Sequence, residues 1–388
     1  MLMKLLKFLL PALPALVCGC EYVDHSGEEV PETVKISVDS VARLLSALPI
    51  GTEQVGEVHD AVSSSSANGY DEEYTMKDLF TAPGAGVGDG ATRTGSSYRT
   101  PLRDLIRDHL ASSLPVTKAE GEVEEYVRLL EDSGLQIYWP YSEEWDGKTL
   151  PVITFDPSNG AEVNVGYRLR EDGSPGIEEV VVDEEMAMDT PVWVVNRNDD
   201  SDYTPVEMLR RQDPEWDGGG SVIVKPSSYT GDVRTLVLKD ITMRRNFDPW
   251  FAGASEFFVK CGRVEDFTAS TEAELKLYSP QVSDFMIVVR RNQLNKKIPF
   301  NVVLVSQWTE LMESIAFMIV EDDGGTRTEW KCSAVVKYNS KSYGFEVSLP
   351  FNTRDDIVWR GQLTGKYLEK YDGMTSRFGD VELTFQFQ

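Results

Sequence analysis

The C-terminal half of the chain alternates apolar and polar residues with a period of two, and this pattern constrains the fold more than any other feature. In the last segment, Val381, Leu383, Phe385 and Phe387 alternate with polar residues, as expected for a strand with one buried face. Similar segments precede it: RTLVLKDIT, SEFFVKC, AELKLY, DFMIVVR, PFNVVLVSQ, SIAFMIV, EWKCSAVVKY and KSYGFEVSL. Short strands at this spacing predict an antiparallel β-sandwich over residues 222–388.

The part of the chain before the sandwich divides into a helical region and a short β unit. Over residues 37–134 apolar residues recur at helical spacing, as in SVDSVARLLSAL, with a glycine-rich flexible loop at 81–98. Over residues 135–212 the period changes to two, and five strands are expected in LQIYWPY, LPVITF, EVNVGYRLR, IEEVVVD and TPVWVVNRN. The acidic, glycine-rich residues 213–221 are expected to form a linker. The sequence therefore predicts a multidomain, mainly β protein with a small helical region.

The N-terminus has the features of a secretory signal peptide. Lys4 and Lys7 give it a basic start, and the apolar run that follows is interrupted by Pro11 and Pro14. This run is shorter than the roughly 20 apolar residues that a membrane-spanning helix requires, and prolines disturb a helix. We therefore expect residues 1–19 to be a signal peptide and not a membrane span.

The apolar run ends with Val17, Cys18, Gly19 and Cys20. These residues resemble the lipobox of bacterial lipoproteins, in which an aliphatic residue, a small residue and a glycine or alanine precede the lipidated cysteine. The resemblance implies cleavage before Cys20, a diacylglycerol on its thiol and a fatty acid such as palmitate on its new amino group. Several acyl chains anchor a protein stably where one is marginal. The alternative is an ordinary signal peptide with an incidental pair of cysteines.

The segment after the cleavage point is acidic, and residues 20–36 are expected to form a polar tether. Acidic stretches at this place resemble the signal for surface display in Bacteroidota, and the order of parts resembles uncharacterised envelope lipoproteins of that group. These resemblances imply an outer-membrane lipoprotein, either periplasmic or exposed on the cell surface. Its membrane contact would be the lipid on Cys20.

The chain is strongly acidic, with a formal net charge of −26 at pH 7. Removal of residues 1–19 takes away two lysines and no acidic residue, which changes the formal charge to −28. Such a surface repels phosphate backbones, which proteins bind through lysine and arginine, so we expect no nucleic-acid partner. Solubility alone explains an acidic excess, and binding of calcium or of a cationic ligand is the alternative.

Histidine-dependent catalysis is excluded from the predicted β domains, because His25, His59 and His109 all precede residue 135. The sequence also lacks an HExxH zinc motif and a G-x-S-x-G nucleophile motif. Paired carboxylates support glycoside hydrolysis without histidine, but with 64 acidic residues no pair is distinctive. We therefore expect a non-enzymatic binding or assembly protein. A carboxylate-dependent glycoside or peptide hydrolase and a fimbrial or adhesin subunit are the alternatives.

Acidic residues in loops provide candidate metal ligands. Asp322 and Asp323 lie in VEDDGGT, and Asp248 lies in NFDPWF. Calcium takes six to eight oxygen ligands from clustered carboxylates and carbonyls, and loops at the end of a sandwich can supply them. The alternative for EDDGG is a hairpin turn with its glycines at positive φ.

Trp250 and Phe251 are candidates for a binding surface. They lie in FDPWFAGASEFFV, a bend with aromatic residues on both sides that leads into a predicted strand. Exposed aromatic side chains suit contacts with carbohydrate or with protein. The alternative is that both side chains fill a core.

Cys261 and Cys332 are the two thiols that remain if Cys18 is removed and Cys20 is lipidated. Both lie in predicted strands of the sandwich, and an exported protein reaches a compartment that permits disulfides. We predict that they lie within bridging distance on neighbouring strands. The alternative is a pair of buried free thiols.

Overall fold

The structure is a computed structural model of the 388-residue chain and describes residues 36–81, 98–113, 119–169, 176–199, 203–213 and 231–388. Residues Ile36–Gln388 form one compact unit. The expected signal peptide, the lipid-accepting Cys20 and the tether up to residue 35 lie outside the described residues, as do most of the loop at 81–98 and most of the linker at 213–221. The expectations for these segments stay predictions.

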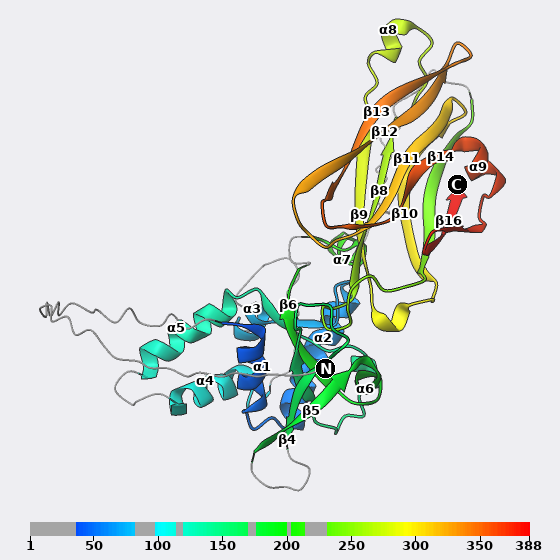
Figure 1. Ribbon diagram of the computed structural model, residues 1–388. Coiled ribbons are helices and arrows are strands. Elements are labelled where there is room, and N and C mark those ends of the chain that lie inside the picture. Colours follow the sequence, from blue (N-terminus) through cyan, green and yellow to red (C-terminus); the bar gives the residue numbers. More distant parts are fainter. Residues whose placement is uncertain (1–35, 82–97, 114–118, 170–175, 200–202, 214–230) are drawn as a thin grey trace, which may run out of the picture. The chain divides into compact units, whose positions relative to one another are not determined.

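Helices predominate in the described part of the chain up to residue 131, and strands predominate after it (Figure 1). The α-helices are α1 (Val38–Ser46), α2 (Thr52–Ala67), α3 (Met76–Phe80), α4 (Leu102–Ser113), α5 (Ala119–Glu131), α6 (Glu184–Asp189), α7 (Val206–Gln212), α8 (Glu272–Leu275) and α9 (Gly365–Lys370). The 3-10 helices are η1 (Ser142–Glu144) and η2 (Arg291–Gln293). The strands up to residue 197 are β1 (Glu73–Thr75), β2 (Leu135–Tyr138), β3 (Val152–Phe155), β4 (Val163–Leu169), β5 (Ile177–Asp183) and β6 (Val192–Arg197). The later strands are β7 (Val233–Met243), β8 (Ser255–Arg263), β9 (Gln281–Val289), β10 (Ile298–Thr309), β11 (Met312–Glu321), β12 (Arg327–Tyr338), β13 (Lys341–Asn352), β14 (Asp356–Thr364), β15 (Thr375–Phe378) and β16 (Val381–Phe387).

The first sheet has six strands in the order β1-β2-β6-β3-β4-β5. Its central strand β6 is apolar on both faces: Trp193 and Val195 face one hydrophobic core, and Val192 and Val194 face another. The five strands predicted from the sequence are all present. They are joined by β1, which comes from the helical region and pairs antiparallel with β2.

One hydrophobic core joins the helices to this sheet. Leu45 of α1 and Val58 of α2 are fully buried and pack in the same core as Trp193. The helical region 37–134 and the β unit 135–212 therefore do not have separate cores. The boundary that the sequence suggested between them does not divide two independent domains.

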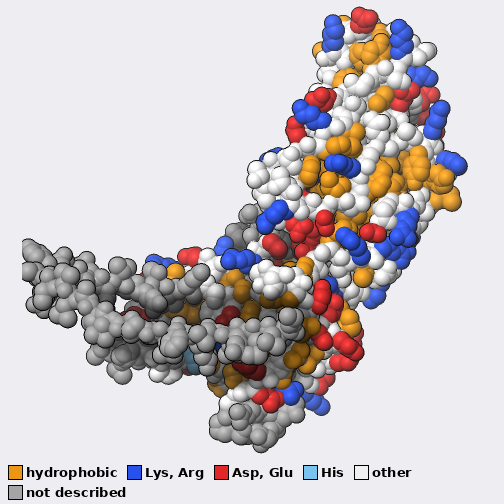
Figure 2. Space-filling view, viewed as in Figure 1, with side chains coloured by type: hydrophobic (Ala, Val, Ile, Leu, Met, Phe, Trp, Pro, Cys, Tyr) orange, Lys and Arg blue, Asp and Glu red, His pale blue; other side chains and the backbone are white. Residues whose placement is uncertain are grey.

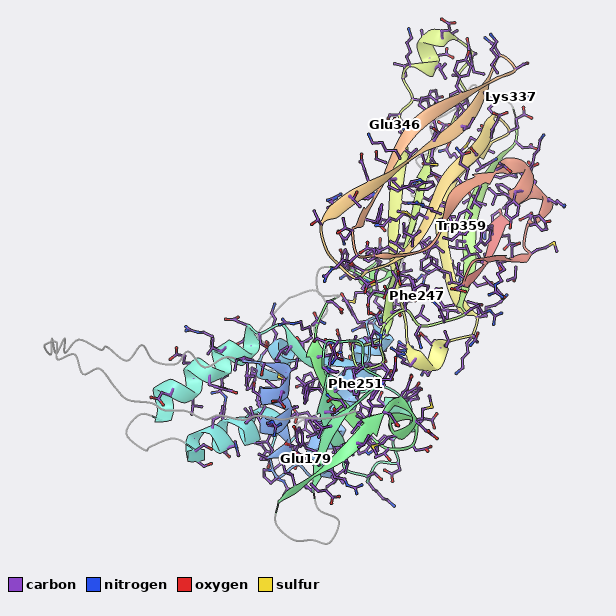
Figure 3. The ribbon with its side chains drawn as sticks, in the orientation of Figure 1. Glu179, Phe247, Phe251, Lys337, Glu346 and Trp359 are labelled. Carbon is purple, nitrogen blue, oxygen red and sulfur yellow. The ribbon has the colours of Figure 1, made fainter. Side chains whose placement is uncertain are left out.

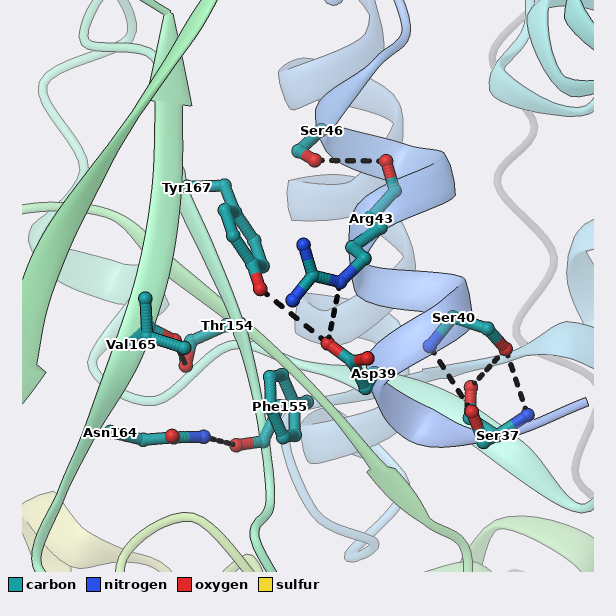
Figure 4. Close-up of polar contacts among 10 residues, drawn as sticks. All are labelled: Ser37, Asp39, Ser40, Arg43, Ser46, Thr154, Phe155, Asn164, Val165 and Tyr167. Carbon is teal, nitrogen blue, oxygen red and sulfur yellow. Dashed lines mark hydrogen bonds and ion pairs between the residues drawn. The ribbon is translucent and has the colours of Figure 1, made fainter.

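Helix α1 is fixed at its N-terminus and against the sheet by short polar contacts (Figure 4). Ser37 and Ser40 form a capping box, in which the Ser40 backbone N–H donates to Ser37 Oγ at 3.2 Å and the Ser37 N–H donates to Ser40 Oγ at 2.9 Å. Arg43 donates to Asp39 at 2.9 Å one turn away, and the Tyr167 hydroxyl of β4 donates to the same carboxylate at 3.4 Å. The start of the helix is thus tied to the sheet that it covers.

Residues 231–388 form the antiparallel β-sandwich that the sequence predicts (Figure 1). One sheet has the order β10-β7-β16-β15, and the other has the order β13-β12-β11-β8-β9 with β14 paired to β11. Alternating apolar residues of the two sheets, such as Leu238 of β7 and Val259 of β8, are buried in a common core. Alternation in strands such as β16, and short apolar runs in strands such as β11, made this part of the fold predictable.

Strand β8 is buried on both of its faces. One face packs in the core of the sandwich, and the other lies under the hairpin of β12 and β13, where a Cβ on Gly262 would overlap Val347. Gly262 therefore permits the close approach of the two backbones. The burial extends to polar residues of SEFFVKC, because Glu256 and Lys260 are each only 6% exposed.

The structure of the sandwich differs from the predicted strands in three places, one of which is the short strand β15 that was not predicted. The segment AELKLY, expected as a strand, contains the end of helix α8, because Thr271 and Glu274 form a capping box that begins a helical turn. Strand β14 was not predicted, since its apolar residues Ile357, Val358 and Trp359 are consecutive and do not alternate. Its pairing with β11 supplies the backbone hydrogen bonds that the sequence pattern does not reveal.

Candidate metal centre at an end of the β-sandwich

Three carboxylates meet where strands β8 and β11 border the loop after β7. Asp248 lies in this loop, Glu256 is the second residue of β8 and Glu321 is the last residue of β11. One carboxylate oxygen from each lies within 4.8 Å of the others. We call these three residues the acidic cluster.

The positions of the cluster residues follow from strand register and from a turn. Strands β8 and β11 are antiparallel with Glu321 opposite Phe257, so Glu256 lies beside the end of β11. The loop returns toward β8 because Ser255 Oγ accepts hydrogen bonds from the backbone N–H groups of Phe247, at 3.1 Å, and Asp248, at 3.3 Å. Asp248 is thus held against the start of β8.

The acidic cluster is largely removed from solvent. Glu321 is 1% exposed and Glu256 is 6% exposed. Two buried oxygens, Asp248 Oδ2 and Glu321 Oε1, accept no hydrogen bond from the described residues. A buried ionised carboxylate without a donor or a cation is costly, so these oxygens require either protons or a bound ion.

The pKa values of Glu321 and Asp248 show the same cost of burying these charges. Burial, together with the neighbouring carboxylates of Asp248 and Asp323, raises the pKa of Glu321 to about 12. Burial also raises the pKa of Asp248, although the charge of Arg291 acts in the opposite direction. At neutral pH the three carboxylates therefore cannot all be ionised unless a cation compensates them.

Only part of the predicted metal set lies at this centre. Asp248 is in the cluster, and Asp323 is close enough to raise the pKa of Glu321. Asp322 instead stabilises the turn, because its Oδ1 accepts from the Gly324 backbone N–H at 2.9 Å and from Asn352 Nδ2 at 3.2 Å. The glycines of EDDGG have the positive φ that the alternative required, +69° at Gly324 and +107° at the next residue.

Glu256 and Glu321 were not identified from the sequence. Glu256 stands alone at the start of the strand segment SEFFV, and Glu321 ends the apolar run AFMIVE and begins the acidic run EDD. Their proximity depends on the pairing of β8 with β11, which the sequence alone does not give. The available signal was chemical: an acidic residue within an otherwise buried strand needs a partner.

Trp250 and Phe251 are not on an exposed surface, so the expectation that they form a binding surface was wrong. Their exposed fractions are 1% and 0%, and the ring centroids are 3.9 Å apart. They pack in a core with residues of the first sheet, and Trp250 Nε1 donates to the Glu162 carbonyl at 3.0 Å. Figure 3 labels Phe251 within this part of the chain and Phe247 at the other end of the loop.

Charged side chains hold the backbone of the loop that carries these aromatics. Arg291, whose side chain is 5% exposed, donates to the carbonyl of Asp248 at 2.6 Å and to that of Gly253 at 3.1 Å. Asp71, two residues before the start of β1, accepts a hydrogen bond from the Ala254 N–H at 3.0 Å. The loop after β7 is therefore bound on one side to the sandwich and on the other to the first sheet.

The predicted disulfide between Cys261 and Cys332 is not formed, and both cysteines are free. Strand β11 lies between their strands in the sheet order. Cys332 is paired with Val347 in the β12–β13 hairpin, so the Cys332 side chain lies on the same face of the hairpin as Val347, which contacts Gly262 of β8. Successive residues of a strand face opposite sides, so the side chain of Cys261 points away from this face. Burial raises the pKa of the Cys261 thiol to about 12, which makes it unreactive.

Comparisons with known proteins give no relative: no family model, curated protein or solved structure matches the chain. Among the helices that the structure describes, none is both long enough and apolar enough to cross a membrane.

Proposed function

We propose that the chain is a bacterial cell-envelope lipoprotein, anchored in the outer membrane through Cys20 and located in the periplasm or at the cell surface. The observation that carries this proposal is the sequence Val17-Cys18-Gly19-Cys20 behind a short apolar segment with a basic start. The compact unit Ile36–Gln388 begins shortly after Cys20 in the chain. A lipid at Cys20 would hold that unit next to the membrane while its own residues stay in water.

The proposed role is binding or assembly. In the acidic cluster Glu256 and Glu321 are buried, so a saccharide or peptide would have no access to either carboxyl group. The shallow groove between α1 and β4 is lined mainly by apolar residues, among them Leu48, Ile50 and Leu169. Neither feature supports the alternative of a carboxylate-dependent hydrolase, which needs two accessible carboxyl groups across a cleft.

The hairpin of β4 and β5 offers a surface for an extended segment of a partner protein. Strand β5 is the last strand of its sheet order, and Val163, Leu169 and Val181 are 52%, 43% and 68% exposed. Register places these three side chains on the same face of the hairpin. An unpaired strand edge with apolar side chains beside it suits the addition of a strand from another protein.

Hydrophobic side chains also reach the surface of the sandwich, where Figure 2 shows them as patches among basic and acidic side chains. Ile357 of β14 and Met374 before β15 are 37% and 55% exposed. The mixed charges around such patches are usual for a water-exposed surface. We therefore place the proposed partner contact at the β4–β5 hairpin, where apolar exposure and a strand edge coincide.

The anchor is tested by metabolic labelling with palmitate in a bacterium that has an outer membrane. We expect the wild-type chain and Cys18→Ser to incorporate label and to be processed. Cys20→Ser should accumulate as an unlabelled precursor. Label that persists in Cys20→Ser would contradict the anchor.

The partner surface is tested by site-specific photocrosslinking in intact cells. A photoreactive residue at Val181 should give a discrete crosslinked species, whereas the same residue at Glu346, an exposed position of β13, should not. Crosslinking at neither position, or equally at both, would contradict a partner contact at the β4–β5 hairpin.

A further inference from the structure

Two buried carboxylate oxygens of the acidic cluster accept no hydrogen bond from the described residues, and this cluster is separate from Cys20 and from the β4–β5 hairpin. Glu321 is 1% exposed, and its Oε1 accepts no hydrogen bond within the described residues. Asp248 Oδ2 is also buried and accepts no hydrogen bond within the described residues, and one carboxylate oxygen of Asp248 lies within 4.8 Å of one from Glu321. Two carboxyl groups from separate parts of the chain, each with one buried oxygen that accepts no hydrogen bond from the described residues, thus meet at one place.

We propose that Asp248, Glu256 and Glu321 bind a calcium ion, and that Asp323 completes the site on its solvent side. Calcium–oxygen distances of about 2.3–2.6 Å place any two ligand oxygens of one ion within about 5 Å of each other. The oxygens of the cluster lie within 4.8 Å of one another. The spacing is that of ligands around one calcium ion.

The donor set selects the class of metal. All the ligands are carboxylate oxygens, which hard cations such as calcium prefer, whereas zinc and copper favour nitrogen or sulfur. Calcium also accepts bidentate carboxylates and variable geometry, so a few glutamate and aspartate side chains can supply most of its six to eight oxygens. Asp323 is exposed and gives the ion a route from solvent.

A calcium ion removes the conflict within the cluster more completely than protons do. One proton shared between Asp248 and Glu321 neutralises only one of their two charges, and Arg291 donates to backbone carbonyls and not to these two carboxylates. One divalent ion contacts all three carboxylates and neutralises two charges. We therefore assign the space between them to the ion.

The ion would connect three segments of the chain. Its ligands come from the loop after β7, from β8 and from β11. Two residues beyond Asp248, the same loop inserts Trp250 into the core beneath the first sheet. Bound calcium should therefore hold Asp248 in place within the β7–β8 loop, which packs against the first sheet through Trp250.

Isothermal titration of the purified full chain with calcium chloride, after removal of metal by a chelator, tests the site at pH 7.5. We expect one ion per chain and a melting temperature several degrees higher in 1 mM calcium than in chelator. Glu321→Gln, which keeps the shape of the side chain but removes its charge, should weaken binding at least 100-fold. Glu346→Gln makes the same change at an exposed site on β13 and should bind like the wild type (Figure 3).

The wild-type titration is decisive even if a variant fails to fold. Absence of calcium binding at millimolar concentration, together with equal melting temperatures in calcium and chelator, would overturn the site. Calcium binding that persists unchanged in both Glu321→Gln and Asp248→Asn would also overturn it, because the ion would then be held elsewhere. Circular dichroism of each variant confirms that it is folded before its affinity is compared.

Discussion

The loop after β7 should contribute a large part of the stability of the first sheet, and Trp250→Ala tests this directly. Trp250 is 1% exposed, its ring lies 3.9 Å from that of Phe251, and its indole N–H donates to the Glu162 carbonyl at 3.0 Å. Truncation of a fully buried tryptophan leaves a cavity and costs about 3–5 kcal/mol. Trp250→Phe retains most of the apolar contact but loses the donor, so it should cost about 1–2 kcal/mol.

Urea unfolding of the full chain, followed by near-ultraviolet circular dichroism, measures these losses. Val181→Ala is the control, because Val181 is 68% exposed and surface changes of this kind are usually within about 0.5 kcal/mol. The order of stability should be wild type and Val181→Ala, then Trp250→Phe, then Trp250→Ala. A loss below about 1 kcal/mol for Trp250→Ala would refute the conclusion that this side chain fills a core.

Three further outcomes follow from the packing and the charges. Gly262→Ala places a methyl group against Val347 and should lower the free energy of unfolding by about 1–3 kcal/mol, measured by thermal melting. In chelator, the free energy of unfolding should fall between pH 5 and pH 8, because folding raises the pKa of Glu321 to about 12 and the unfolded chain releases this proton. Glu321 contributes at most about 1.4 kcal/mol per pH unit to this slope, so the slope should be smaller in Glu321→Gln than in the wild type. Alkylation in urea followed by mass spectrometry should find the thiols of Cys261 and Cys332 free, and Cys261 should react far more slowly in the native chain than in urea. A disulfide-linked pair of peptides containing these two cysteines would contradict the structure.

Some strands of the sandwich were predictable from one-sided burial, and others, such as β11, from a short apolar run typical of a strand buried on both faces. In β16, apolar and polar residues alternate along the strand, so the sequence states which face is buried. Strand β14 has no such alternation, and its existence depends on hydrogen bonds to β11. The segment AELKLY alternates polar and apolar residues and so predicted a strand, but the capping box between Thr271 and Glu274 begins the helical turn α8 instead.

The candidate metal centre was predictable only in part, because it depends on register. Asp248 and Asp323 stand in acidic or turn-forming segments that attract attention in the sequence, and both lie at or beside the centre. Glu256 and Glu321 are distant in the chain and meet only through the pairing of β8 with β11. No periodicity in either strand specifies which other strand will lie beside it.

The roles expected for Trp250 and for the cysteines failed for related reasons. An aromatic residue in a loop has the same sequence pattern whether it is exposed or inserted into a neighbouring core, and here it is inserted. Likewise, two cysteines in strands of one sandwich can form a bridge only if they face each other. Cys261 and Cys332 lie on faces that point apart, which the alternation of each strand by itself did not determine.

The central claim, that the protein is held in the bacterial envelope by a lipid on Cys20, is tested most directly at the N-terminus of the native protein. Mass spectrometry of protein purified from membranes of a bacterium that produces it identifies both the first residue and its modification. We expect a chain that begins at Cys20, with a diacylglycerol on the thiol and an acyl chain on the amino group. A mature chain that begins at another residue, or that begins at Cys20 with a free thiol, would contradict it.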